Sequence, residues 1–207
     1  MKVGDEGIVT APDDEAYDFL GLEPGSDAWV IPQTQDPDVV WAGWNTQEPD
    51  VLGALDLGTT LRVLGVDGPG DITVYLQSGN FGAPQPPWTS HEPFPKESWI
   101  DDNTRANANW EFDEPGVYLV EIEFVADLID GQRVSARDTL RFAVGDETSA
   151  DEAFAATFDE SMTPEETVAG PEATDTTDAD DTAAAEDDGT LGMLVGVVVA
   201  VVAGALL

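Results

Sequence analysis

Residues 117–126 read VYLVEIEFVA, and residues 133–144, which follow shortly after Asp130-Gly131, read RVSARDTLRFAV. Apolar residues fall on alternate positions in both stretches, which is typical of antiparallel strands with one buried face. An Asp-Gly pair between two such runs predicts a β-hairpin with a type I′ turn. This hairpin is the most regular pattern in the chain, and it favours an all-β fold.

The sequence before the hairpin agrees with that fold class. Residues 60–66 and 71–77 are rich in β-branched and aromatic side chains and predict two more strands. Residues 113–118 read DEPGVY, which resembles the tyrosine corner of immunoglobulin-like sandwiches; the alternative is a Pro-Gly turn before a surface tyrosine. We expect a single immunoglobulin-like antiparallel β-sandwich over residues 11–145, with Trp110 and Phe112 on its buried face.

Composition excludes several classes of function. The chain has 207 residues with 43 Asp and Glu against 7 Lys and Arg, a formal net charge of -36, so it lacks the basic surface that nucleic acids require. It contains no Cys, which excludes disulfide frameworks, thiolate metal sites and a Cys nucleophile. Its single histidine, His91, disfavours a multi-histidine metal site or a Ser-His-Asp triad. We therefore predict no enzyme activity, no cofactor and no metal.

The excess of acidic residues also points to an environment. An acidic, lysine-poor surface repels itself in dilute buffer, whereas molar salt screens it over about 3 Å. We interpret the composition as adaptation to high salt, in a halophilic archaeon. A calcium-binding surface is the alternative, but the chain has no D-x-[DN]-x-[DN]-G loop to support it.

The two ends of the chain differ from its centre. Residues 146–190 hold 16 acidic residues and no Lys or Arg, which predicts a disordered acidic linker. Residues 191–207 form an uncharged apolar run of about 26 Å as a helix, which predicts a C-terminal transmembrane anchor. Residues 1–10 contain no apolar signal segment, and we expect them to be the remnant of a truncated or misassigned start. Together these features predict a domain on the outside of the cell membrane.

Residues 107–118 read NANWEFDEPGVY. This segment resembles the H-x-N-W-x-F-x-x-P-G-x-Y signature of the surface-anchored repeat family, whose members are described as choice-of-anchor M or actinobacterial surface-anchored domains. A later Asp-Gly turn, the blocks WVIPQTQ at 29–35 and WAGWNT at 41–46, and the closing LRFAVG at 140–145 are similar to further blocks of that family. The positions that carry the resemblance, which we expect to be structural, are Asn107, Asn109, Trp110, Phe112, Pro115, Gly116, Tyr118, Asp130 and Gly131.

The resemblance implies an extracellular immunoglobulin-like module held to the cell by its anchor. Its expected function is non-catalytic: surface structure, adhesion or an accessory role beside a transporter, with ABC-transporter components or surface-layer proteins as partners. The alternative is a ligand-capturing solute-binding component of an ABC importer, with a metal as one candidate ligand. Family members carry histidine just before the Asn-Trp pair, where this chain has Arg105, Ala106 and Asn107.

The proline-rich segment around residues 82–95 is a candidate ligand loop, with Trp88 and His91 as its candidate residues. Trp88 could form an aromatic platform for a carbohydrate or peptide with Trp41 and Trp44, and the alternative is that the tryptophans fill the core. A polyproline-like spacer is the alternative for the segment itself. A hard-cation site from His91-Glu92 with Asp101-Asp102 is a further, weaker hypothesis.

Overall fold

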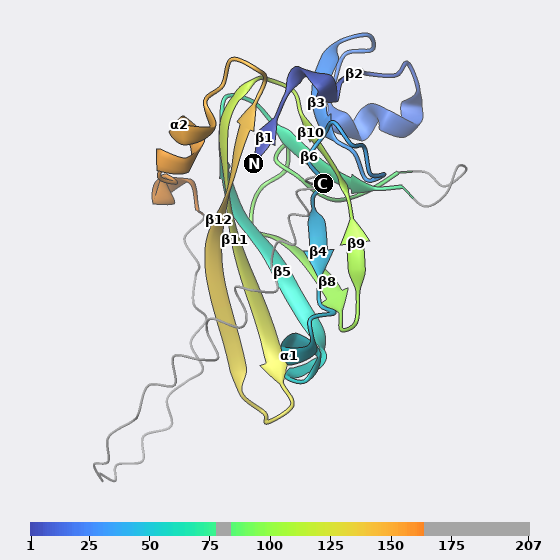
Figure 1. Ribbon diagram of the computed structural model, residues 1–207. Coiled ribbons are helices and arrows are strands. Elements are labelled where there is room, and N and C mark those ends of the chain that lie inside the picture. Colours follow the sequence, from blue (N-terminus) through green and yellow to red (C-terminus); the bar gives the residue numbers. More distant parts are fainter. Residues whose placement is uncertain (78–83, 164–207) are drawn as a thin grey trace.

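The computed structural model describes residues 1–77 and 84–163, and these residues form a sandwich of two five-stranded sheets (Figure 1). The long sheet has the order β1 (Lys2–Val3), β12 (Arg133–Val144), β11 (Gly116–Leu128), β5 (Leu55–Asp67) and β8 (Lys96–Asp101). The short sheet has the order β2 (Ile8–Thr10), β3 (Asp27–Ile31), β10 (Asn109–Phe112), β6 (Ile72–Leu76) and β7 (Gln85–Thr89). The all-β prediction is confirmed.

Short elements complete the described fold. Strands β4 (Gly43–Asn45) and β9 (Arg105–Asn107) pair as a separate two-stranded sheet. The helices are α1 (Pro49–Leu52) and α2 (Ala150–Ala155), with the 3-10 turns η1 (Asp5–Gly7), η2 (Glu15–Leu20) and η3 (Glu160–Met162). Every strand pair is antiparallel except that of β1 with β12, among the residues that the structure describes.

The predicted hairpin is present as β11 and β12, which pair from Gly116–Val144 to Asp127–Arg133. Its turn is not of the predicted type. A type I′ turn needs positive φ at both central residues, whereas Gly131 has φ 86 and Asp130 is not among the positive-φ residues. The Gly131 N–H instead donates to the Leu128 carbonyl, and the Leu128 N–H donates to the Gln132 carbonyl. Only Gly131 adopts the left-handed conformation, so the connection between β11 and β12 is a longer loop than the two-residue type I′ turn.

The tyrosine corner is confirmed. The Tyr118 hydroxyl donates to the Glu114 carbonyl at 2.7 Å, and the Tyr118 side chain is fully buried. Its ring packs edge-on against Phe112 at 5.1 Å, and Phe112 contacts Phe142 of the return strand at the same distance. The alternation in β11 therefore directs Tyr118 inward, and the corner joins the two sheets through aromatic contacts.

The folded unit is larger than the predicted 11–145. Strand β1 pairs in parallel with the end of β12 in the long sheet, and β2 pairs with β3 in the short sheet. Residues 2–10 therefore contribute one strand to each sheet. The Lys2 ammonium adds hydrogen bonds to the carbonyls of Gly145, Asp146 and Thr148. At the other end, α2 lies against β11 and β12, beyond the expected boundary. The contacts of Lys2 and β1 join residues about 140 positions apart, so local sequence patterns do not signal them.

The predicted transmembrane segment 191–207 and most of the predicted linker, residues 164–190, lie outside the described residues. Residues 146–163, assigned to the linker by composition, instead contain α2 and η3. Within the described ranges, no helix is long and apolar enough to cross a membrane.

Candidate binding face

The asparagines of the resemblance motif take part in internal hydrogen bonds. The Asn109 side-chain oxygen accepts from the Gln33 N–H at 2.8 Å, and the Asn107 amide donates to the Ala42 carbonyl at 3.4 Å. Trp110 and Phe112 are buried on the core side of β10, as predicted. These side chains connect strands and loops of the sandwich, which is a structural arrangement.

The two turns of the motif lie far apart. Strand β11 begins at Gly116, directly after Pro115, and Gly116 passes so close to Pro69 that a Cβ would stand 2.7 Å from the proline ring. Asp130 and Gly131 lie beyond the opposite end of this 13-residue strand, about 40 Å away at the usual strand rise. The motif residues therefore do not converge on one site.

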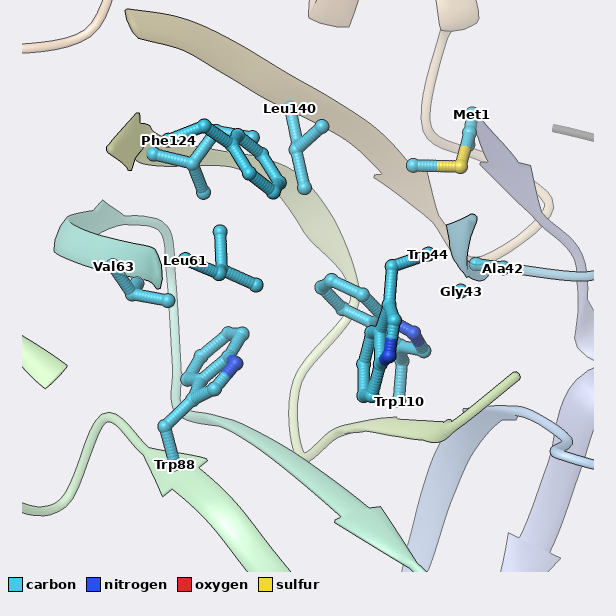
Figure 2. A pocket seen from close by; sticks show the side chains of 11 residues that line it. Met1, Ala42, Gly43, Trp44, Leu61, Val63, Trp88, Trp110, Phe124 and Leu140 are labelled. Atoms are coloured by element: carbon cyan, nitrogen blue, oxygen red, sulfur yellow. The ribbon is translucent and has the colours of Figure 1, made fainter. Parts of the chain in front are cut away.

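Trp88 lies in the core, and its assignment to a ligand loop is wrong. It belongs to strand β7, is 3% exposed, and packs edge-on against Trp110 at 5.7 Å. Figure 2 shows both indoles facing an apolar cavity between the sheets, with Leu61 and Phe124 on its wall. The cavity has a volume of about 20 Å³, and a space that holds roughly one water does not admit a sugar or peptide.

His91 is a bridge between chain segments. Its Nε2 lies 2.8 Å from the Leu20 carbonyl at the end of η2, and its Nδ1 lies 3.1 Å from a carboxylate oxygen of Asp71. Both ring nitrogens are engaged with this protein's own acceptors. The histidine therefore fastens η2 to the start of β6, and the expected ligand loop does not form from Trp88 and His91.

A row of alternating charges crosses the outer face of the long sheet. Arg62 of β5 contacts Glu123 of β11 at 2.5 Å and Glu97 of β8 at 3.1 Å, and Arg137 of β12 contacts Glu123 at 3.1 Å. The strand register places the four residues directly opposite one another, in the order Glu97, Arg62, Glu123, Arg137. We call this row the charge ladder. The Glu123 side chain is only 8% exposed, so its two arginine partners offset the cost of burying its charge.

The same register builds a second row beside the ladder, towards the β11–β12 turn. Trp99 of β8, Thr60 of β5, Val125 of β11 and Ser135 of β12 follow one another across the strands. An open groove of about 360 Å³ lies over parts of both rows, and neither Trp99 nor Arg137 belongs to its lining. We call it the face groove, and its lining consists of Thr60, Arg62, Glu97, Glu123, Val125, Arg133, Val134 and Ser135.

Trp99 lies beside the face groove and not in its lining: it is the cross-strand neighbour of Thr60, which does line the groove, and 57% of its surface is exposed. Its indole N–H donates to the Asp101 carboxylate at 2.8 Å, on the same face of β8. Its six-membered ring lies over Gly58, where a Cβ would stand 2.7 Å from Cζ2. The indole is therefore held along the sheet surface, with its outer side open to solvent.

One carboxyl lies buried on the outer side of the short sheet. Glu111 of β10 is 2% exposed, and its Oε1 has no hydrogen-bond partner among the described residues. Burial, together with the nearby charges of Asp113 and Asp71, raises the pKa of Glu111 to about 8. This face also carries Tyr75, which packs against Tyr17 and Phe19 of η2. The raised pKa favours the uncharged, protonated form of Glu111.

Sequence reasoning did not single out the face groove. The alternation of residues 96–101 contains the signal for Trp99, because Ile100 points inward and its neighbour must then point outward. The charge ladder forms only when four strands pair, and no local sequence pattern predicts that pairing. Within the described residues, no group of three or more side chains is arranged to hold a metal ion.

A scan against protein-family models and searches of curated proteins and of solved structures found no match to this chain.

Proposed function

We propose that this chain is a non-catalytic binding module of a cell surface, with an immunoglobulin-like sandwich held outside the membrane of a cell that lives in concentrated salt. The face groove is the observation that carries the binding role. It is open, and cross-strand ion pairs fix three of its polar side chains, Arg62, Glu97 and Glu123, before any ligand arrives. Preorganised polar groups favour noncovalent recognition because little ordering remains to be done on binding.

The proposed location has separate support. A net charge of -36 suits a surface in molar salt, and residues 191–207 have the composition of a membrane anchor. The tyrosine corner and the aromatic contacts between the sheets support the immunoglobulin-like assignment. The resemblance of residues 107–118 to surface-anchored domains agrees with both.

Within this function, the module would serve surface structure, adhesion or a neighbouring transporter, with surface-layer proteins or ABC-transporter components as partners. A metal-capturing role for an ABC importer has weaker support. The residues at the position of the resembling family's histidines include Asn107, which donates its amide to the Ala42 carbonyl.

Protease treatment of intact cells tests the location. We expect a soluble fragment that contains residues 1–163 to be released, because the composition of the chain beyond them predicts an extended segment open to cleavage. A cytoplasmic marker protein should stay intact under the same conditions. A fragment that appears only after the cells are lysed would overturn the proposed location.

A further inference from the structure

The face groove and the neighbouring Trp99 together have the elements of a sugar site. Trp88 and Trp110 are buried in the core, whereas Trp99 is 57% exposed. The hydrogen bond to Asp101 and the close approach to Gly58 keep its ring along the sheet. A fixed, outward-facing indole presents a flat apolar surface, which matches the C–H face of a pyranose ring.

Polar groups follow on one side of this platform at the spacing of the strands. Thr60 lies directly opposite Trp99 in the register, and Ser135 continues the row two strands further on. Cross-strand neighbours stand about 5 Å apart, and a hydroxyl both donates and accepts hydrogen bonds. Glu97 and Arg133, with side chains 60% and 72% exposed, add an acceptor and a donor at the rim. This mixture of donors and acceptors suits the hydroxyl groups of a sugar.

The charge of the groove favours an uncharged ligand. Its lining contains Arg62 and Arg133 against Glu97 and Glu123, so its formal charges cancel. The chain as a whole carries a net charge of -36, which disfavours a polyanion even beside these arginines. A volume of about 360 Å³ lies within the usual range of small-ligand sites, roughly 300–1,000 Å³.

We propose that the face groove, together with Trp99 beside it, binds an uncharged oligosaccharide: one sugar ring stacks on Trp99, and the hydroxyls of further rings bond to Thr60, to Ser135 and to the exposed charged groups of the groove. This inference rests on the proposed binding function and names its ligand class. The nearby ladder then serves as a rigid wall, because each of its arginines is held by Glu123.

Calorimetric titration of the purified full chain in molar KCl tests the proposal. The probes are cellopentaose, mannopentaose and N-acetylchitopentaose, with polygalacturonate as the charged comparison. We expect at least one neutral probe to bind, and Trp99→Ala to weaken that binding by about tenfold or more, as truncation of an aromatic anchor does. Phe154→Ala is the matched control, because Phe154 is an 83% exposed aromatic on α2, outside the groove, and its loss should leave the affinity unchanged.

Arg133→Ala removes a donor from the rim, and we expect it to weaken binding severalfold while the melting temperature stays the same. Three results would overturn the sugar assignment: no neutral probe binds, polygalacturonate binds more tightly than every neutral probe, or Trp99→Ala binds as well as the parent. Sedimentation that shows self-association abolished by Trp99→Ala would also overturn it, by making a second copy of the chain the occupant. An absence of oligosaccharide binding in solution would leave the protease result on intact cells unaffected. The ligand assignment and the proposed cell-surface location can therefore fail separately.

Discussion

Replacing Glu111 with glutamine should change how stability depends on pH. The pKa of Glu111 is raised from 4.5 to about 8, chiefly by burial and then by the charges of Asp113 and Asp71. The folded protein therefore keeps a proton that the unfolded chain releases as pH rises above 4.5. Stability must fall as pH rises through this window, and the fall ends above about pH 8, where both states are ionised.

The pKa difference sets the size of the effect. A raise from 4.5 to about 8, at about 1.4 kcal/mol per pKa unit, corresponds to an upper limit on the order of 5 kcal/mol between the ends of the window. Glutamine has nearly the same shape and does not titrate. Glu111→Gln should therefore resemble the parent near pH 5 and be more stable than it near pH 9, with a melting temperature higher by at most roughly 10–20 °C.

Thermal melts of the full chain at constant molar KCl, from pH 5 to pH 9, measure this effect. Glu23→Gln is the matched control, because Glu23 is exposed and its loss changes the net charge by the same amount. The control should follow the parent at every pH. A constant difference between the parent and Glu111→Gln from pH 5 to pH 9 would refute the reasoning that Glu111 is buried with a raised pKa.

Three further predictions concern stability. The melting temperature should rise steeply as KCl is increased to molar concentration, because the net charge of -36 is then screened, and a melt indifferent to salt would remove the high-salt interpretation. Tyr118→Phe should lower the free energy of unfolding by about 1 kcal/mol, measured in urea, because the Glu114 carbonyl loses its donor. Trp110→Ala should cost about 3–5 kcal/mol, and circular dichroism showing an unchanged fold and melt would contradict its place in the core.

The parts of the fold that the sequence predicted are those with a local cause. The alternation of apolar residues predicted the buried face of β11. The Pro115-Gly116 turn predicted the tyrosine corner, in which Tyr118 bonds to the carbonyl of Glu114, four residues before it. The prolines before Trp88 indicated a loop, yet β7 is an edge strand, where a residue without an N–H group is tolerated. Trp88 therefore points into the core, although the composition of its segment indicates a loop.

The parts that the sequence did not predict depend on tertiary partners. Glu111 sits at an alternate strand position, which usually faces water, and here it is buried. Glu123 follows the same pattern, and only the arginines of two neighbouring strands explain how its charge is buried. A single sequence shows the alternation, but it does not show what covers the second face.

The position of β12 has a mechanical consequence. Strand β12 begins with Arg133 at the face groove and ends with Val144 beside β1. After Val144 the chain continues to α2. Tension between a ligand held in the groove and the chain beyond residue 163 would therefore run along β12. The hydrogen bonds to β11 lie across that direction, so the load would shear many of them together instead of opening them one after another. Helix α2 would detach first, and the sandwich would resist until the whole β11–β12 pairing slipped.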